Sequence, residues 1–150
     1  MSNDFDYPRT AAEVLTEPMV FPPAVLRAVK KAARTKMWQG DLEARRAKLQ
    51  QLNRDLGEAY GVEPPLLVFE GNGVGCSGAS TYSPSSNMIT MRGRTSLITF
   101  YHEWCHRLYG RSERKAVQVS LLLFKEAFPK SWSRLRFHGH MARRDDLVGS

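Results

Sequence analysis

Cysteine, long hydrophobic runs and acidic residues are all scarce in this chain of 150 residues. Its two cysteines, Cys76 and Cys105, are too few for a disulfide framework, and we expect free thiols in a reducing compartment. No apolar run approaches the length of a membrane span. The N-terminus, MSNDFDYPRT, lacks the basic and then apolar segments of a signal peptide. These absences predict a cytoplasmic protein with no membrane partner.

The charge balance is basic, with 22 lysines and arginines against 15 acidic residues and a formal net charge of +7. Such a balance favours nucleic acid, or a protein bound to it, as a partner, although charge runs are usually solvated faces. Aromatic residues are not interleaved with the cations as they are in single-strand binders. One cluster crowds a predicted helix: Arg27, Lys30, Lys31, Arg34 and Lys36. A second cluster lies around residues 100–110 in sequence: Arg92, Arg94, Arg107, Arg111, Arg114 and Lys115.

Three segments are expected along the chain. Residues 1–21 show little periodicity and are expected to form a flexible or loosely docked lead. Residues 22–130 carry helix and strand signals, and their apolar content is enough for one core. Residues 131–150 are polar and basic, which predicts a partly disordered tail. The order of signals in the middle segment predicts an α+β domain with a short three-stranded sheet.

The element boundaries are predicted by capping and turn residues. The expected order is a helix from Pro22 to Gly40, a helix at 42–60, strands at 66–70, 79–83 and 87–92, a helix ending at Gly110, and a helix at 113–128 that Pro129 ends. The candidate N-caps are Asp41, Thr95 or Ser96, and Ser112. The glycine-rich loop at 71–78 lacks the spacing and the terminal Lys-Ser/Thr of a phosphate-binding loop.

The stretch FYHEWCHRLYG, at residues 100–110, carries the strongest chemical signal. Residues four apart lie on one face of a helix, so His102 and His106 can direct ring nitrogens at one ion. Glu103 can reach a water molecule on that ion without binding the ion itself. In the H-E-x-x-H motif two imidazoles hold Zn²⁺ and the glutamate takes a proton from the water. The pattern therefore predicts a zinc site with Glu103 as general base, and coincidence or a degenerate remnant is the alternative.

A catalytic zinc site needs a third protein ligand and one open position. Glu113 is the first candidate, because a tight helix-Gly-helix turn could fold it back over the histidines. An acidic residue favoured by the helix dipole is the ordinary explanation for its position. His138 or His140 is the second candidate. Cys76 and Cys105 are weaker candidates, and Cys105 is better explained as a small buried apolar residue.

The segment from 66 to 128 resembles the small gluzincin metallopeptidases. SGASTYSPSSNMITMRG leads into SLITFYHEWCH, and GRSERKAVQVSLLLFKEAFP follows. This last part is similar to the E-x-x-A…A-x-x-L-L-x-P helix of ImmA/IrrE-type peptidases of phages and mobile elements, with matching positions at Glu113, Ala116, Ser120 and Leu123. The resemblance implies a zincin-like fold in which Zn²⁺ is held by the two histidines and Glu113, and a protein or peptide substrate such as a regulator.

Two departures separate the chain from that pattern. The stretch from His106 to Glu113 is shorter than is usual there, and Val117 replaces a customary Asn or Asp that would support the ligands. SprT-like peptidases, which act on proteins bound to DNA, share the HExxH helix and use a third histidine. That second resemblance would favour His138 or His140 as the third ligand.

The resemblance also implies two features that bind substrate. An edge strand within 87–92 would pair with an extended peptide. A polar side chain would stabilise the oxyanion of the transition state, and the candidates are Tyr109, Tyr82 and His138.

The sequence therefore predicts a zinc-dependent metallopeptidase. The alternative is a basic phage or plasmid type of protein that binds nucleic acid or a host protein and carries a structural or vestigial zinc site.

Overall fold

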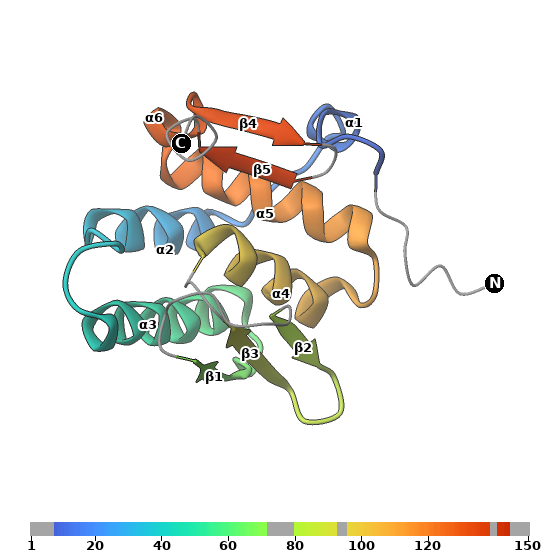
Figure 1. The fold of residues 1–150 in the computed structure, drawn as a ribbon. Coiled ribbons are helices and arrows are strands. Elements are labelled where there is room, and N and C mark those ends of the chain that lie inside the picture. The colour runs from blue at the N-terminus through green and yellow to red at the C-terminus, as the bar shows by residue number, and fades with distance from the viewer. Residues whose placement is uncertain (1–7, 72–79, 93–95, 139–140, 145–150) are drawn as a thin grey trace.

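The computed structural model describes residues 8–71, 80–92, 96–138 and 141–144 (Figure 1). The helices in these residues are α1 (Ala12–Leu15), α2 (Pro23–Arg34), α3 (Leu42–Tyr60), α4 (Leu97–Tyr109), α5 (Glu113–Ala127) and α6 (Pro129–Trp132). The strands are β1 (Leu66–Glu70), β2 (Thr81–Ser83), β3 (Met88–Arg92), β4 (Leu135–His138) and β5 (Met141–Arg144). The predicted α+β class and the short three-stranded sheet are confirmed, and the finer zincin-like assignment stays a prediction.

Local capping residues set both ends of α3 and the start of α4. The Asp41 side chain accepts a hydrogen bond from the Ala44 N–H at 2.8 Å and begins α3. Gly61 ends that helix in the left-handed region at φ +69°. The Ser96 hydroxyl accepts from the Thr99 N–H at 3.3 Å and begins α4. Of the two caps predicted for α4, Ser96 is therefore the one confirmed, and residue 95 lies outside the described residues.

The sheet has the strand order β1-β3-β2. β1 runs parallel to β3, with Leu67 opposite Ile89, and β2 runs antiparallel to β3, with Tyr82 opposite the same Ile89. The expectation that the strand at 87–92 is an edge strand is therefore wrong, because β3 lies between two partners. β2 and β1 are the edges, and β2 is the edge that lies beside α4.

The core lies between α2, α3, α4, α5 and the inner face of the sheet. α4 contributes its largest side chains to this core, because Phe100, Tyr101 and Trp104 are at most 1% exposed. Cys105 is also buried, as expected for a small apolar residue. Burial of this face leaves the opposite face of α4, which carries His102 and His106, at the surface.

Residues 8–21 differ from the flexible lead expected for 1–21. α1 packs on α5 through Val14, which is 0% exposed and belongs to one buried cluster with Val117 and Leu121. The Arg114 guanidinium forms ion pairs with Glu13 at 3.3 Å and with Glu17. These partners lie about one hundred residues apart in the sequence, so local periodicity gave no sign of the contact.

The segment expected as a basic tail at 131–150 also carries secondary structure. α5 ends at Ala127, and Pro129 opens α6 rather than simply ending the preceding helix. β4 and β5 then pair as an antiparallel hairpin, with Leu135 opposite Arg144. None of the helices described is long and apolar enough to serve as a membrane span.

Candidate metal centre

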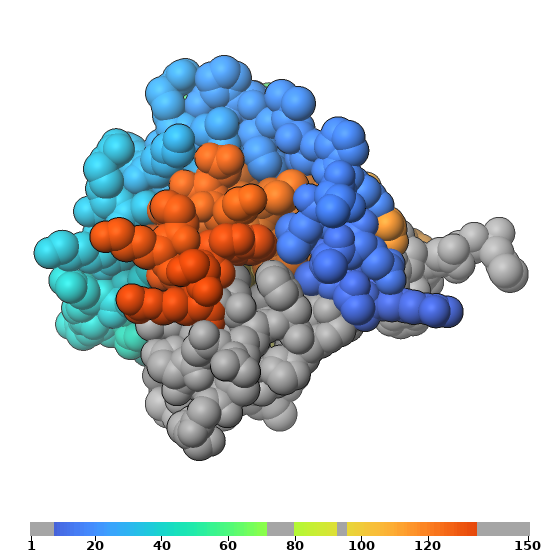
Figure 2. Space-filling model, turned by 90° about the horizontal axis from the view of Figure 1, so that it is seen from above, coloured from blue at the N-terminus to red at the C-terminus, as the bar shows by residue number. Residues whose placement is uncertain are grey.

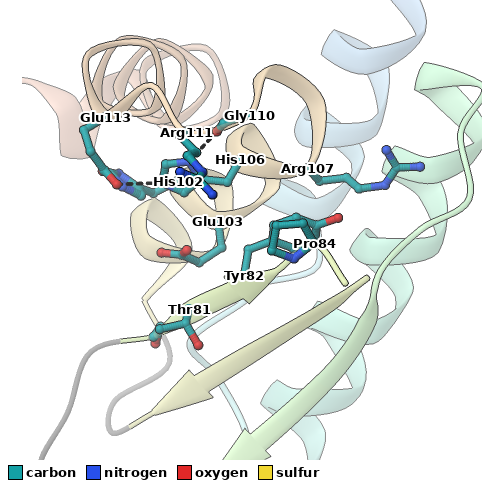
Figure 3. Close-up of a pocket in the computed structure, with 11 residues that line it drawn as sticks. Thr81, Tyr82, Pro84, His102, Glu103, His106, Arg107, Gly110, Arg111 and Glu113 are labelled. Atoms are coloured by element: carbon teal, nitrogen blue, oxygen red, sulfur yellow. Dashed lines mark hydrogen bonds and ion pairs between the residues drawn. The ribbon is translucent and has the colours of Figure 1, made fainter. Parts of the chain in front are cut away.

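A sharp turn between α4 and α5 brings the predicted ligands together. Gly110 ends α4 with φ +79° and ψ −143°, a conformation that disfavours any side chain. The Ser112 hydroxyl then accepts from the Lys115 N–H at 3.1 Å and begins α5. Glu113 is consequently the first residue of α5 and lies against the last turns of α4 (Figure 3).

His102, His106 and Glu113 form a cluster whose potential ligand atoms all lie within 4.8 Å of one another. Nε2 of His102 lies 2.8 Å from one carboxylate oxygen of Glu113, and Nε2 of His106 lies 3.1 Å from the other. Ligand atoms around a tetrahedral Zn²⁺ lie roughly 3.3 Å apart, given metal–ligand distances of about 2.0–2.1 Å. The cluster therefore fits a cation of this size after small side-chain adjustments, and the two-nitrogen, one-carboxylate donor set suits zinc.

The ring of His106 is oriented by the backbone of the same turn. Its Nδ1 lies 2.7 Å from the carbonyl oxygen of Gly110. A carbonyl oxygen can only accept, so Nδ1 donates its proton to it, and in the neutral ring Nε2, on the side of Glu113, is then the nitrogen with the lone pair. Such outer contacts fix the tautomer and direction of a metal-binding histidine. The sequence predicts Gly110 as a helix stop but gives no sign of its contact with His106.

Glu103 lies between α4 and the edge strand β2, and it is only 7% exposed. Burial raises the pKa of its carboxyl group to about 7, and the nearby charge of Glu113 also raises it. The charge of His102 and a hydrogen bond from the backbone N–H of Tyr82 act in the opposite direction. A carboxyl group with a pKa near 7 can both accept and donate a proton at neutral pH, as a general base and acid must.

A cleft of about 720 Å³ opens in front of these residues. One wall is β2 with its flanking residues, and the other is formed by the end of α4 and the start of α5 (Figure 3). Two cations, Arg107 and Arg111, belong to the helical wall and favour acidic groups in a bound molecule. The lining residues are Ser80, Thr81, Tyr82, Pro84, His102, Glu103, His106, Arg107, Gly110, Arg111 and Glu113.

Of the three candidate oxyanion stabilisers, Tyr82 is the one whose described side chain lines this cleft. Tyr82 lines it, but its hydroxyl lies 2.9 Å from Oδ1 of Asn87 and is committed to the β2–β3 turn. Tyr109 does not line the cleft, and Nζ of Lys115 lies 5.2 Å from the centre of its ring. The backbone of His138 belongs to β4, while the placement of its side chain lies outside what the structure describes.

The remaining candidate ligands are either buried or outside the described residues. His140 and Cys76 lie outside the described residues. Cys105 is buried, and burial raises the pKa of its thiol to about 12. Val117, where the ImmA/IrrE pattern has a polar residue, is 3% exposed and packs on α1. Position 117 therefore holds the N-terminal segment in place.

Two members of the second basic cluster are neutralised by acidic partners. Arg92 pairs with Glu70 at 2.7 Å, and Arg114 pairs with two glutamates near the N-terminus. Nε of Arg107 lies 3.3 Å from the carbonyl oxygen of Glu63. Only Arg107 and Arg111 of this cluster line the cleft, and residue 94 lies outside the described residues.

Comparison of the chain with models of known protein families, with curated proteins and with solved structures gave no match.

Proposed function

We propose that the protein is a zinc-dependent metallopeptidase of minimal gluzincin type. The observation that carries this proposal is the cluster of His102, His106 and Glu113 at an open cleft, with the buried carboxyl group of Glu103 beside it. Structural zinc sites are usually closed by four protein ligands, whereas catalytic sites have three and an open position. Among the described residues three donors face the cleft, which supports a catalytic site over the structural zinc of a binding protein.

In the proposed reaction the chain's own groups hold the ion and move a proton. The two imidazoles and Glu113 would be the ligands, and Gly110 would keep the lone pair of His106 in place. Zn²⁺, when bound, would lower the pKa of a water ligand and polarise the scissile carbonyl group. Glu103 would take the proton from the attacking water and deliver it to the leaving amine.

The edge strand β2 would hold the substrate. Its partner β3 occupies one side, and within the described residues no strand pairs with the other side. An extended peptide could add to this free edge and place its carbonyl group in front of the cluster. Arg107 and Arg111 on the opposite wall would favour peptides with acidic groups.

A peptide-mixture digestion tests the proposal. The zinc-loaded parent, Glu103→Gln and the exposed control Glu58→Gln would be incubated with a proteome-derived peptide mixture, and new N-termini counted by mass spectrometry. We expect cleavage by the parent and Glu58→Gln, and a loss of about 10²-fold or more in Glu103→Gln despite full zinc binding. A Glu103→Gln variant that cleaves like the parent, or a zinc-loaded parent that cleaves nothing, would overturn the proposal.

A further inference from the structure

The charge of this chain is segregated rather than spread evenly. Two stretches, 22–40 and 127–144, hold ten of the 22 lysines and arginines and none of the 15 acidic residues. The rest of the chain therefore has 12 cations against 15 acidic residues, a net charge of −3. The basic character belongs to two limited segments, and the residues of the proposed catalytic cleft lie in neither.

The first segment places its cations on one face of α2. Arg27, Lys30, Lys31 and Arg34 have the three- and four-residue spacing of a single helical face, and all four are exposed. The opposite face is buried through Val25, Ala28, Val29 and Ala32. Because this buried face packs on α3 and α5, the row of cations is held on a rigid support.

Few acidic groups balance this row. Nζ of Lys30 lies 4.0 Å from Glu126, and Nζ of Lys31 lies 3.2 Å from Asp55. Both are surface pairs, which stabilise little. In the part of the chain that the structure describes, no acidic group pairs with Arg27, Arg34 or Lys36.

The second segment begins beside the end of the first. The rings of Trp38 and Phe128 lie 4.8 Å apart, which brings the chain after α2 against the start of α6. Two cations follow this contact in the chain, Lys130 in α6 and Arg134 just after it, and both are exposed. Figure 2 shows α6 and the end of α5 beside the α2 region on one side of the molecule.

We propose that this surface, formed by α2 and α6 and here called the α2–α6 face, binds the phosphodiester backbone of nucleic acid without sequence preference. Protein interfaces depend on a buried apolar centre, and Trp38, at 44% exposure, is the one large exposed hydrophobic residue described at this face. Interfaces with nucleic acid are polar and strongly basic, as this face is. The length of α5 separates this face from the proposed catalytic cleft. Glu113, at the start of α5, faces the cleft, and Ala127, at its end, lies about 20 Å further along at a rise of 1.5 Å per residue. Nucleic acid on the α2–α6 face would therefore leave the cleft open.

Fluorescence anisotropy with a labelled random-sequence duplex DNA, measured over a salt series, tests this proposal. The variant Arg27→Gln/Lys30→Gln/Arg34→Gln removes three charges from the face. The control Arg9→Gln/Arg54→Gln/Arg92→Gln removes the same number elsewhere, so both variants have the same net charge. We expect the face variant to bind at least about tenfold more weakly and its slope of log K against log salt to fall by about 2–3, at about 0.9 per lost phosphate contact. The affinity of the control variant for the duplex should stay within about twofold of that of the parent.

Equal losses in the two variants would overturn the proposal, because binding would then follow net charge alone. Absence of binding by the parent at about 50 mM salt would also overturn it. Competition with polyglutamate separates the two kinds of polyanion. Displacement of the duplex by polyglutamate at matched charge concentration would assign the face to acidic proteins instead. Circular dichroism and thermal unfolding of both variants verify that each is folded, and none of these readouts depends on peptidase activity.

Discussion

The indole Nε1–H of Trp104 donates a hydrogen bond to Oδ1 of Asn53 at 2.8 Å. Nδ2 of Asn53 donates in turn to the carbonyl oxygen of Pro65, also at 2.8 Å. Trp104 and Asn53 are both buried, and Trp104 lies directly after Glu103 on the inner face of α4. One buried amide therefore joins α3, the start of β1 and the helix that carries the proposed ligands.

Asn53→Ala should destabilise the protein by about 2–3 kcal/mol, because it leaves the Trp104 N–H and the Pro65 carbonyl group buried without a partner. Urea unfolding measures this free energy. Gln51→Ala on the same helix is the control, since Gln51 is exposed and should change stability by less than about 0.5 kcal/mol. Similar free energies of unfolding for the two variants would contradict a stabilising role of the buried Asn53 amide.

Gly57→Ala should also destabilise the protein, although alanine in a helix interior is normally more stabilising than glycine by about 0.5–1 kcal/mol. A Cβ at position 57 of α3 would lie 2.9 Å from the Pro64 ring, closer than carbon atoms pack. We expect a loss of about 1–3 kcal/mol, measured by urea unfolding. Pro64→Ala in the same chain should recover part of that loss, and a Gly57→Ala variant more stable than the parent would contradict the packing described.

Gly110→Ala tests whether the α4–α5 turn orients a ligand. The new side chain would strain the backbone at φ +79° and move the carbonyl group that holds His106. Zinc affinity, measured by competition with a chromophoric chelator, should fall about 10–100-fold. Gly61→Ala is the matched control, because φ there is +69° and the residue ends α3 away from the cluster. It should cost stability but leave zinc affinity unchanged, and equal affinities in the two variants would refute the orienting role.

Features that depend on neighbouring residues could be predicted from the sequence. The caps at Asp41, Ser96 and Ser112 act within one helical turn, so their positions are visible in the sequence. The meeting of the two histidines with Glu113 follows from a four-residue helical spacing and one tight turn, and the structure places them within ligand distance.

Features that depend on distant segments could not be predicted. The strand order β1-β3-β2 arises from a parallel pairing across more than twenty residues, so the sequence pattern predicts the edge strand in the wrong segment. The docking of α1 depends on Arg114, far along the chain from Glu17. The α2–α6 face likewise depends on the contact between Trp38 and Phe128, which brings together two stretches without acidic residues that lie far apart in the sequence.

The zinc content of protein purified without added metal tests the central claim most directly. The parent would be compared with Glu113→Ala, with the His138→Ala/His140→Ala pair, and with Glu126→Ala as an exposed glutamate control on the same helix. We predict about one zinc per chain in the parent, the histidine pair and Glu126→Ala, and loss of zinc in Glu113→Ala alone. Zinc that survives in Glu113→Ala but is lost in the histidine pair, or a parent that takes up none, would contradict the proposed centre.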